Sequence, residues 1–281
     1  MPDADRLLRT LHRAVQAFDS TPGRRGRTAR IADADEVLVA GDLHGNIDNF
    51  RRLLARAELA ARPRRHLVLQ ELIHGPFHYP GDGDKSHQLV DLVAALKCEY
   101  PTQTHLLLGN HELAQWQEEW IAKGDSELTQ SFQDGIDTAY GARSGEVYEA
   151  YVRLFARAAF AVRTPNRVFL SHSMPSRRRL PSFEPRILEQ DAIEGHHLAL
   201  GGAIHSLVWG RDTSQAAADA FLQLVDADLL ITGHIPCEKG FEAPNSRQII
   251  LDCMAAPAAY CLFPTNRPLT HEELVACVGI L

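Results

Sequence analysis

Short apolar runs alternate with segments of helical periodicity along the first part of the chain. The runs at 37–40, 66–70 and 104–108 are continuous, short and rich in Leu and Val, which is typical of buried strands. Between them, residues 47–61 and 87–100 repeat apolar positions three and four apart, as amphipathic helices do. Strands and helices are therefore expected to alternate here.

The second half of the chain is richer in strands. Residues 112–160 are mostly of helical pattern, and helices are also expected near 187–200 and 214–226. The combination predicts an α/β (α+β) protein in which mixed β-sheets form a sandwich covered by helices. No repeat or linker divides the chain, so residues 1–281 are predicted to form a single domain. The further strands are expected at 160–163, 168–171, 229–232, 248–252 and 259–263.

The first 30 residues consist of a predicted helix and a basic connector. Residues 3–18 have apolar positions at helical spacing. Residues 19–27 are polar, contain two glycines and carry three arginines. Charge runs of this kind are usually solvated, so we expect an exposed loop, with a phosphate-facing arm as the alternative.

Metal-ligand residue types follow four of the apolar runs. The first run ends in Gly41-Asp42-Leu43-His44-Gly45-Asn46. In an extended segment, residues two apart point to the same side, so Asp42 and His44 can face one ion. The third run ends in Gly109-Asn110-His111-Glu112, and the strands at 168–171 and 229–232 lead to His172 and His234.

This repetition predicts a metal centre at one edge of a sheet. Oxygen and nitrogen donors together suit Mn, Fe or Zn better than Ca. Two such ions, roughly 3.5–4 Å apart, would clamp a phosphoryl group and generate a nucleophile. Beside them, Glu112 is expected to orient His111 and to tune its basicity, as carboxylates next to histidines often do.

The chain resembles the calcineurin-like metallophosphoesterases. The resemblance rests on four motifs taken together: GDLHGN at 41–46, GNHE at 109–112, SH at 171–172 and GH at 233–234. The likeness is closest to the phosphoprotein-phosphatase branch and its bacterial relatives. The resemblance implies a four-layer αββα sandwich of two mixed β-sheets flanked by helices. It further implies that His111 is the general acid for the leaving oxygen, or stabilises that oxygen. The implied metal ligands are Asp42 and His44 for the first ion, and Asn110, His172 and His234 for the second.

The second motif of that family, GDxxDRG, is not present as such. The strand that should deliver it runs into Gln70-Glu71-Leu72-Ile73-His74-Gly75-Pro76. In this register Glu71 takes the position of the metal-bridging aspartate, and His74 that of the second aspartate. An alternative register uses Asp82, but no strand precedes it, so Glu71 is favoured because ligands are held best on rigid elements.

Binding of the phosphate is then assigned to other residues. The family often has an arginine before GNHE, where this chain has Leu108. Arg211, after Trp209, is the first candidate, and Arg178 in the run 177–179 is the second, because a guanidinium matches a pair of phosphate oxygens. His74 is a third candidate, as a donor or cation that replaces the missing Asp–Arg pair.

Composition and charge limit the classes of binding partner and the cellular location that we expect for the protein. The formal net charge of −7 gives no electrostatic basis for binding nucleic acid or a membrane surface. Five cysteines without a CxxC pair predict free thiols in a reducing compartment. No membrane span or secretory leader is expected, so the predicted location is the cytoplasm.

The sequence thus predicts a dinuclear metal-dependent phosphoesterase that acts on phosphomonoesters, with phosphoserine or phosphothreonine proteins as the first choice of substrate. A dinucleoside polyphosphate hydrolase is the alternative enzyme. A phosphate-binding or regulatory protein without catalysis is the alternative from another class, because the second motif is broken. The oligomeric state is left open.

Overall fold

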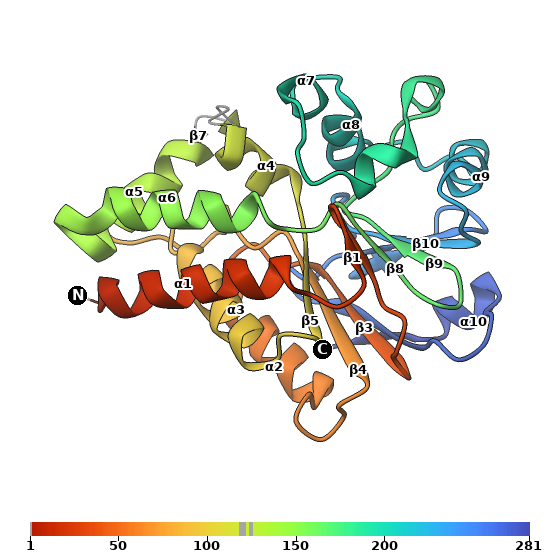
Figure 1. The fold of residues 1–281 in the computed structure, drawn as a ribbon, viewed down its shortest axis with the longest axis horizontal. Helices are drawn as coiled ribbons and strands as arrows, with labels where there is room; N and C mark the ends of the chain where they lie inside the picture. The colour runs from red at the N-terminus through yellow and green to blue at the C-terminus, as the bar shows by residue number, and fades with distance from the viewer. Residues whose placement is uncertain (1, 118–121, 124–125) are drawn as a thin grey trace.

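Two mixed β-sheets packed face to face form the centre of the molecule, with helices on both sides (Figure 1). This architecture comes from a computed structural model that describes residues 2–117, 122–123 and 126–281. Figure 1 shows helices α1 (Ala4–Asp19), α2 (Ile47–Ala57) and α3 (His87–Glu99) on one side of the sheets, whereas α7 (Gly195–Leu198), α8 (Ala203–Trp209) and α9 (Gln215–Leu224) lie on the other side. The predicted sandwich of two sheets flanked by helices is confirmed.

The five-stranded sheet has the order β14-β13-β3-β4-β5. Strands β3, β4 and β5 are parallel, whereas β13 and β14 run antiparallel to their neighbours. Because the three parallel strands share a direction, their carboxyl ends meet at one edge of the sheet. The strands are β3 (Glu36–Asp42), β4 (Arg65–Gln70), β5 (Thr104–Leu107), β13 (Ala259–Pro264) and β14 (Val278–Ile280).

The seven-stranded sheet has the order β1-β2-β8-β9-β10-β12-β11. Here β9, β10 and β12 are parallel, and their carboxyl ends again meet. A parallel bridge between Asp42 and Asp252 joins the two sheets at this edge. The strands are β1 (Arg24–Arg25), β2 (Thr28–Arg30), β8 (Ala161–Arg163), β9 (Val168–Leu170), β10 (Leu229–Thr232), β11 (Phe241–Glu242) and β12 (Gln248–Leu251).

The helices occupy the outer faces of the sandwich. Asp3 caps α1 by accepting a hydrogen bond from the Arg6 amide, and Asn46 caps α2 in the same way. Short strands β6 (Ala122–Lys123) and β7 (Ser126–Glu127) follow α4. The helices are α1 (Ala4–Asp19), α2 (Ile47–Ala57), α3 (His87–Glu99), α4 (Asn110–Gln117), α5 (Leu128–Tyr140), α6 (Ser144–Phe155), α7 (Gly195–Leu198), α8 (Ala203–Trp209), α9 (Gln215–Leu224) and α10 (His271–Val275), with 3₁₀ turns at Gly141–Arg143, Leu180–Ser182 and Pro185–Glu189.

Successive side chains along each strand point to opposite faces of the sheet, so the hydrophobic core has two parts. In β3, Val37 and Val39 pack between the sheets, whereas Leu38 and Ala40 pack against the helices. The apolar runs of the sequence are continuous because both faces of these strands are buried. One face therefore fixes the distance between the sheets and the other anchors the helices, so the strand ends are held rigidly.

The basic connector is not an exposed loop. Residues 24–25 and 28–30 form β1 and β2, which join the seven-stranded sheet. Arg27 is only 4% exposed, and its guanidinium lies 5.8 Å from the ring centre of Trp116 and donates to the carbonyl of Ala156. Charge alone predicted solvation, but these contacts satisfy the guanidinium inside the fold.

Two predicted helices are shorter than expected. Helix α2 ends at Ala57 rather than at residue 61, because Glu58 takes a left-handed conformation. The helix predicted near 187–200 is a 3₁₀ turn and the four-residue α7, separated by irregular chain. Residues 118–121 and 124–125 of the mostly helical region fall outside the described residues. Within the described part of the chain, no helix combines the length and apolarity needed to span a bilayer.

Candidate metal centre

The carboxyl ends of five strands bring the predicted ligands together. Asp42 ends β3, and Glu71 follows β4 directly. Asn110 begins α4 shortly after β5, and His172 and His234 follow β9 and β10. All five side chains are buried. The two sheets contribute to one cluster because their parallel strands end at the same edge of the sandwich.

Four electron-pair donors of this cluster lie in mutual contact. His172 Nε2 is 2.7 Å from Glu71 Oε2 and 2.9 Å from Asn110 Oδ1. The same Asn110 oxygen lies 2.7 Å from His234 Nδ1. Among the described residues, Glu71, His172 and His234 form a group whose ligand atoms all lie within 4.8 Å of one another. A cation between them would satisfy all of these atoms at once.

Gln70 fixes the tautomer of His172. The Gln70 amide nitrogen donates to the carbonyl of Ala40, so its oxygen is the acceptor that lies 3.0 Å from His172 Nδ1. The hydrogen of His172 is therefore on Nδ1, and its Nε2 electron pair faces Glu71 and Asn110. Burial lowers the pKa of His172 to about 3, so the ring stays neutral and can act as a ligand. The donor set thus fits a metal ion.

Asp42 and His44 offer a second set of donors. Asp42 Oδ2 accepts the His234 amide hydrogen at 2.8 Å, whereas Oδ1 is buried without a hydrogen-bond partner. Burial raises the pKa of Asp42, and the nearby Glu71 charge raises it further. His44 Nδ1 donates to the carbonyl of Ile73 at 2.8 Å, which leaves Nε2 as the free ligand atom. An ion near Asp42 Oδ1 would offset the cost of burying that oxygen.

Glu71 lies where the sequence placed it. Its Oε1 accepts the amide hydrogen of His111 at 3.1 Å while Oε2 faces His172. Gly109 makes room for this longer side chain, since a Cβ there would lie 2.6 Å from Glu71 Oε1. Asp82, the alternative, has a side chain 97% exposed that pairs with His78, so the alternative register is wrong.

Glu112 does not orient His111 as expected. Its Oε1 accepts the backbone amides of Leu72 and Ile73 at 2.7 and 3.2 Å. It therefore holds the backbone that follows Glu71, and burial together with the Glu71 charge raises its pKa well above the usual range. The expected role was wrong because α4 turns Glu112 toward the loop after β4 rather than toward the His111 ring.

His111 is held by His74 instead. The two Nδ1 atoms are 2.5 Å apart, and Gln115 Nε2 donates to His74 Nε2 at 3.0 Å. Tyr148 donates to the Gln115 oxygen at 2.8 Å, which sets the orientation of the amide. His74 must then carry its hydrogen on Nδ1 and donate it to His111, so the hydrogen of His111 is on Nε2.

His74 is consequently not a substrate contact. The residue is 7% exposed, and burial lowers its pKa to about 3, so it is neutral. The prediction that it supplies a cation to the phosphate is wrong, because the ring is enclosed by His111, Gln115 and Phe132. His74 acts through His111.

Comparison with known proteins agrees with this geometry. The family model for calcineurin-like phosphoesterases matches residues 36–238, which include all six predicted ligands and His111. The chain belongs to the calcineurin-like phosphoesterases. It is a phosphoric ester hydrolase.

Solved structures show the same fold. A Saccharomyces cerevisiae protein serine/threonine phosphatase, described as similar to human phosphatase PP5, superposes with a TM-score of 0.67 at 16% identity, over 93% of this chain and 82% of that one. A cold-active protein-tyrosine phosphatase from a Shewanella species gives a TM-score of 0.59 at 17% identity, over 84% of this chain and 77% of that one. These likenesses establish the arrangement of the strands that carry the phosphoesterase site.

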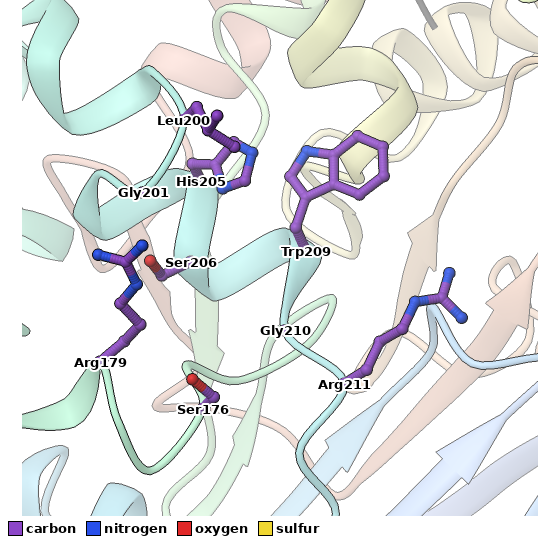
Figure 2. Close-up of a pocket in the computed structure, with 9 residues that line it drawn as sticks. All are labelled: Ser176, Arg179, Leu200, Gly201, His205, Ser206, Trp209, Gly210 and Arg211. Carbon is purple, nitrogen blue, oxygen red and sulfur yellow. The ribbon is translucent and has the colours of Figure 1, made fainter. Parts of the chain in front are cut away.

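Of the two predicted phosphate-binding arginines, Arg211 lies beside the cluster of candidate ligands. Arg211 borders a pocket of about 220 Å³ on the rim, together with Trp209 and Arg179 (Figure 2). Burial lowers the pKa values of His172 and His234, and the nearby positive charge of Arg211 lowers them further. Arg178 is exposed and is not among the residues that line this pocket, so its contact with substrate stays a prediction.

Three residues of the site were missed in the sequence. Gln70 was quoted only as the residue before Glu71, and Gln115 lies in the region predicted to be mostly helical. Asp252 ends the strand predicted at 248–252, and its carboxylate accepts the amide hydrogens of Cys237 and Met254 at 3.0 Å, which fixes the loop after His234. Asp252 carried a signal, since it is another carboxylate at the end of an apolar run.

Proposed function

We propose that this phosphoesterase uses two transition-metal ions to hydrolyse phosphomonoesters, with phosphoserine or phosphothreonine proteins as its first substrates. The observation that carries this proposal is the contact between neutral His172 and the oxygens of Glu71 and Asn110. Electron-pair donors at 2.7 and 2.9 Å are mutually repulsive without a cation. Buried polar atoms that serve only the fold are normally paired through a hydrogen bond, which needs a hydrogen between the two atoms.

The ligands divide into two sets with one shared carboxylate. Asp42 and His44 would hold one ion, and Asn110, His172 and His234 the other. Glu71 lies against both sets and would be shared. Ions of the Mn, Fe or Zn type suit these donors, and when bound they polarise the phosphoryl group and supply a nucleophile at neutral pH.

The protein's own residues would then orient the substrate and donate to the leaving oxygen. His111 directs Nε2–H away from His74, so this hydrogen is available to the leaving oxygen as charge develops there. The exposed Arg211 guanidinium would bind two non-bridging phosphate oxygens. Trp209, whose ring centre is 6.5 Å from that of His111, forms the adjoining wall.

Two further points support the choice of substrate and compartment. The serine/threonine phosphatase that superposes with a TM-score of 0.67 shares the fold over nearly the whole chain. All five cysteines are free, which supports a location in the reducing cytoplasm.

The test combines activity with metal content. Wild-type protein should retain two ions per chain after desalting and should hydrolyse p-nitrophenyl phosphate and a phosphoserine peptide with Mn²⁺. Glu71→Gln, which keeps the shape and removes the charge, should lose metal and at least 100-fold in turnover. The matched control is Asp82→Asn, an exposed carboxyl removed from the same loop, which should change neither. Wild-type protein that binds two ions but cleaves no phosphomonoester would refute the proposed activity.

A further inference from the structure

The rim pocket beside the metal centre is lined by hydrogen-bond donors. Figure 2 shows Arg179, Ser176 and Ser206 near one another on one side, with Trp209 above Gly210 and the Arg211 side chain extending away from them on the other side. None of the residues that line the pocket is acidic. A concave site with the Arg179 guanidinium, two hydroxyl groups and no carboxylate is suited to an anion.

Neither arginine has an ionic partner in the described part of the chain. Some other exposed arginines do: Arg64 pairs with Asp33 and Asp35, and Arg167 pairs with Asp226 and Asp228. No carboxylate of the described residues lies within ion-pair distance of Arg179. Its guanidinium is therefore available to a ligand rather than to the fold.

The pocket is shaped to hold the Arg179 side chain. Gly201 has a φ of 80°, and a Cβ at this position would lie 3.0 Å from Arg179 Nη2. Glycine thus tolerates the left-handed backbone and leaves the guanidinium its place. The indole Nε1 of Trp209 is buried without a hydrogen-bond partner, and Figure 2 shows it on the side of the ring that faces His205. A buried donor of this kind also calls for an acceptor.

The Trp209 side chain separates the pocket from the candidate metal centre. The Trp209 ring centre lies 6.5 Å from His111 and 5.9 Å from His234 on the side of the metal centre, and 5.8 Å from His205 on the pocket side. An extended peptide advances roughly 3.3–3.6 Å per residue. A side chain two or three residues from the scissile phosphate would therefore reach the pocket.

We propose that this pocket is a specificity subsite for a second anionic side chain of a phosphopeptide, two or three residues from the phosphorylated residue. This rests on the proposed phosphatase function. Arg179 is its main determinant, with the hydroxyl groups of Ser176 and Ser206 beside it. A nucleobase is disfavoured, because His205 already stacks on the indole at an angle of 19°.

The test compares matched phosphoserine peptides that differ at one position, which carries Gln, Glu or a second phosphoserine. The wild type should show a kcat/KM roughly five- to tenfold higher for the two anionic peptides than for the neutral one, as expected for a partly exposed charged hydrogen bond. Arg179→Met should abolish this preference by raising the KM for the two anionic peptides, with kcat unchanged. Arg177→Met, which removes the same charge two residues away on the same loop, should keep it. The ratio between the carboxylate and phosphate peptides identifies the preferred anion.

A binding measurement separates this inference from the catalytic proposal. The peptides are labelled with fluorescein, their scissile phosphoserine is replaced by a non-hydrolysable phosphonate, and binding is followed by fluorescence anisotropy. The same preference, lost in Arg179→Met, is expected even if no peptide is hydrolysed. Equal binding of neutral and anionic peptides by the wild type would overturn the subsite, as would an equal loss of preference in Arg177→Met, even if p-nitrophenyl phosphate is still hydrolysed.

Discussion

Restoring the family's aspartate at the bridging position should weaken this metal centre. Glu71 reaches two groups at once: Oε1 accepts the His111 amide hydrogen at 3.1 Å, and Oε2 is 2.7 Å from His172 Nε2. Glu71→Asp shortens the side chain by one methylene, about 1.5 Å. Oε1 would then lose the hydrogen bond from the His111 amide, and Oε2 would withdraw from the position in which it faces His172. The surrounding residues fit the longer side chain, since Gly109 leaves the space that Glu71 fills.

The size of the effect follows from the lost contact. A hydrogen bond to a charged group contributes about 1.5–3 kcal/mol, which corresponds to roughly a ten- to hundredfold change in an equilibrium constant. We therefore expect the Mn²⁺ concentration for half-maximal activity to rise by that factor in Glu71→Asp.

The assay is a Mn²⁺ titration of p-nitrophenyl phosphate hydrolysis, with metal content measured on the desalted protein. Glu71→Gln distinguishes the effect of side-chain length from that of charge, because it keeps the length and removes the negative charge. If Glu71→Asp binds Mn²⁺ as tightly as the wild type, the structure-based account of the bridging position is wrong.

Three more substitutions test the support of the site and its acid stability. Gln70→Leu removes the acceptor that orients His172, so metal affinity should fall roughly 10- to 100-fold in the same titration, and unchanged affinity would dismiss the role of Gln70. His74→Leu removes the partner of His111, so turnover of phenyl phosphate, a poor leaving group, should fall roughly 100-fold, whereas 2,4-dinitrophenyl phosphate should change little; equal losses would contradict proton donation by His111. Burial lowers the pKa of His87 to about 4 from 6.5, so below pH 6.5 the unfolded chain binds a proton that the folded chain does not, and stability falls as the pH falls. His87→Gln should recover about 2 kcal/mol of the unfolding free energy lost between pH 7.5 and 5.0, measured by denaturant unfolding, and an unchanged loss would exclude His87.

The convergence of the candidate ligands was predictable because its signals are local. Asp42, His44 and His234 each follow a short apolar run, and such runs are typical of buried strands. Once the strands are parallel, their carboxyl ends meet, and residues far apart in sequence become neighbours. Glu71 was found in the same way, from the run that precedes it, although its motif has diverged.

The partners of His111 were not predictable, because they depend on how α4 is turned. Glu112 and Gln115 are three residues apart on this helix, yet one contacts the loop after β4 and the other contacts His74. A rotation of the helix would exchange these contacts without altering any pattern in the sequence. Arg27 is a similar case, since its burial depends on the Ala156 carbonyl more than 100 residues away.

Four residues of the metal centre adopt backbone conformations that side chains generally avoid. His44, Glu71, His74 and His234 have φ values of 42°, 47°, 61° and 66°. Left-handed conformations of this kind cost roughly 1–2 kcal/mol for each residue that has a Cβ, and glycine would remove most of that cost. A library of variants selected only for thermal resistance should therefore accumulate glycine or asparagine at these four positions. One selected for turnover should keep histidine and glutamate, so the two selections would separate the residues that the reaction requires from those that the fold alone would choose.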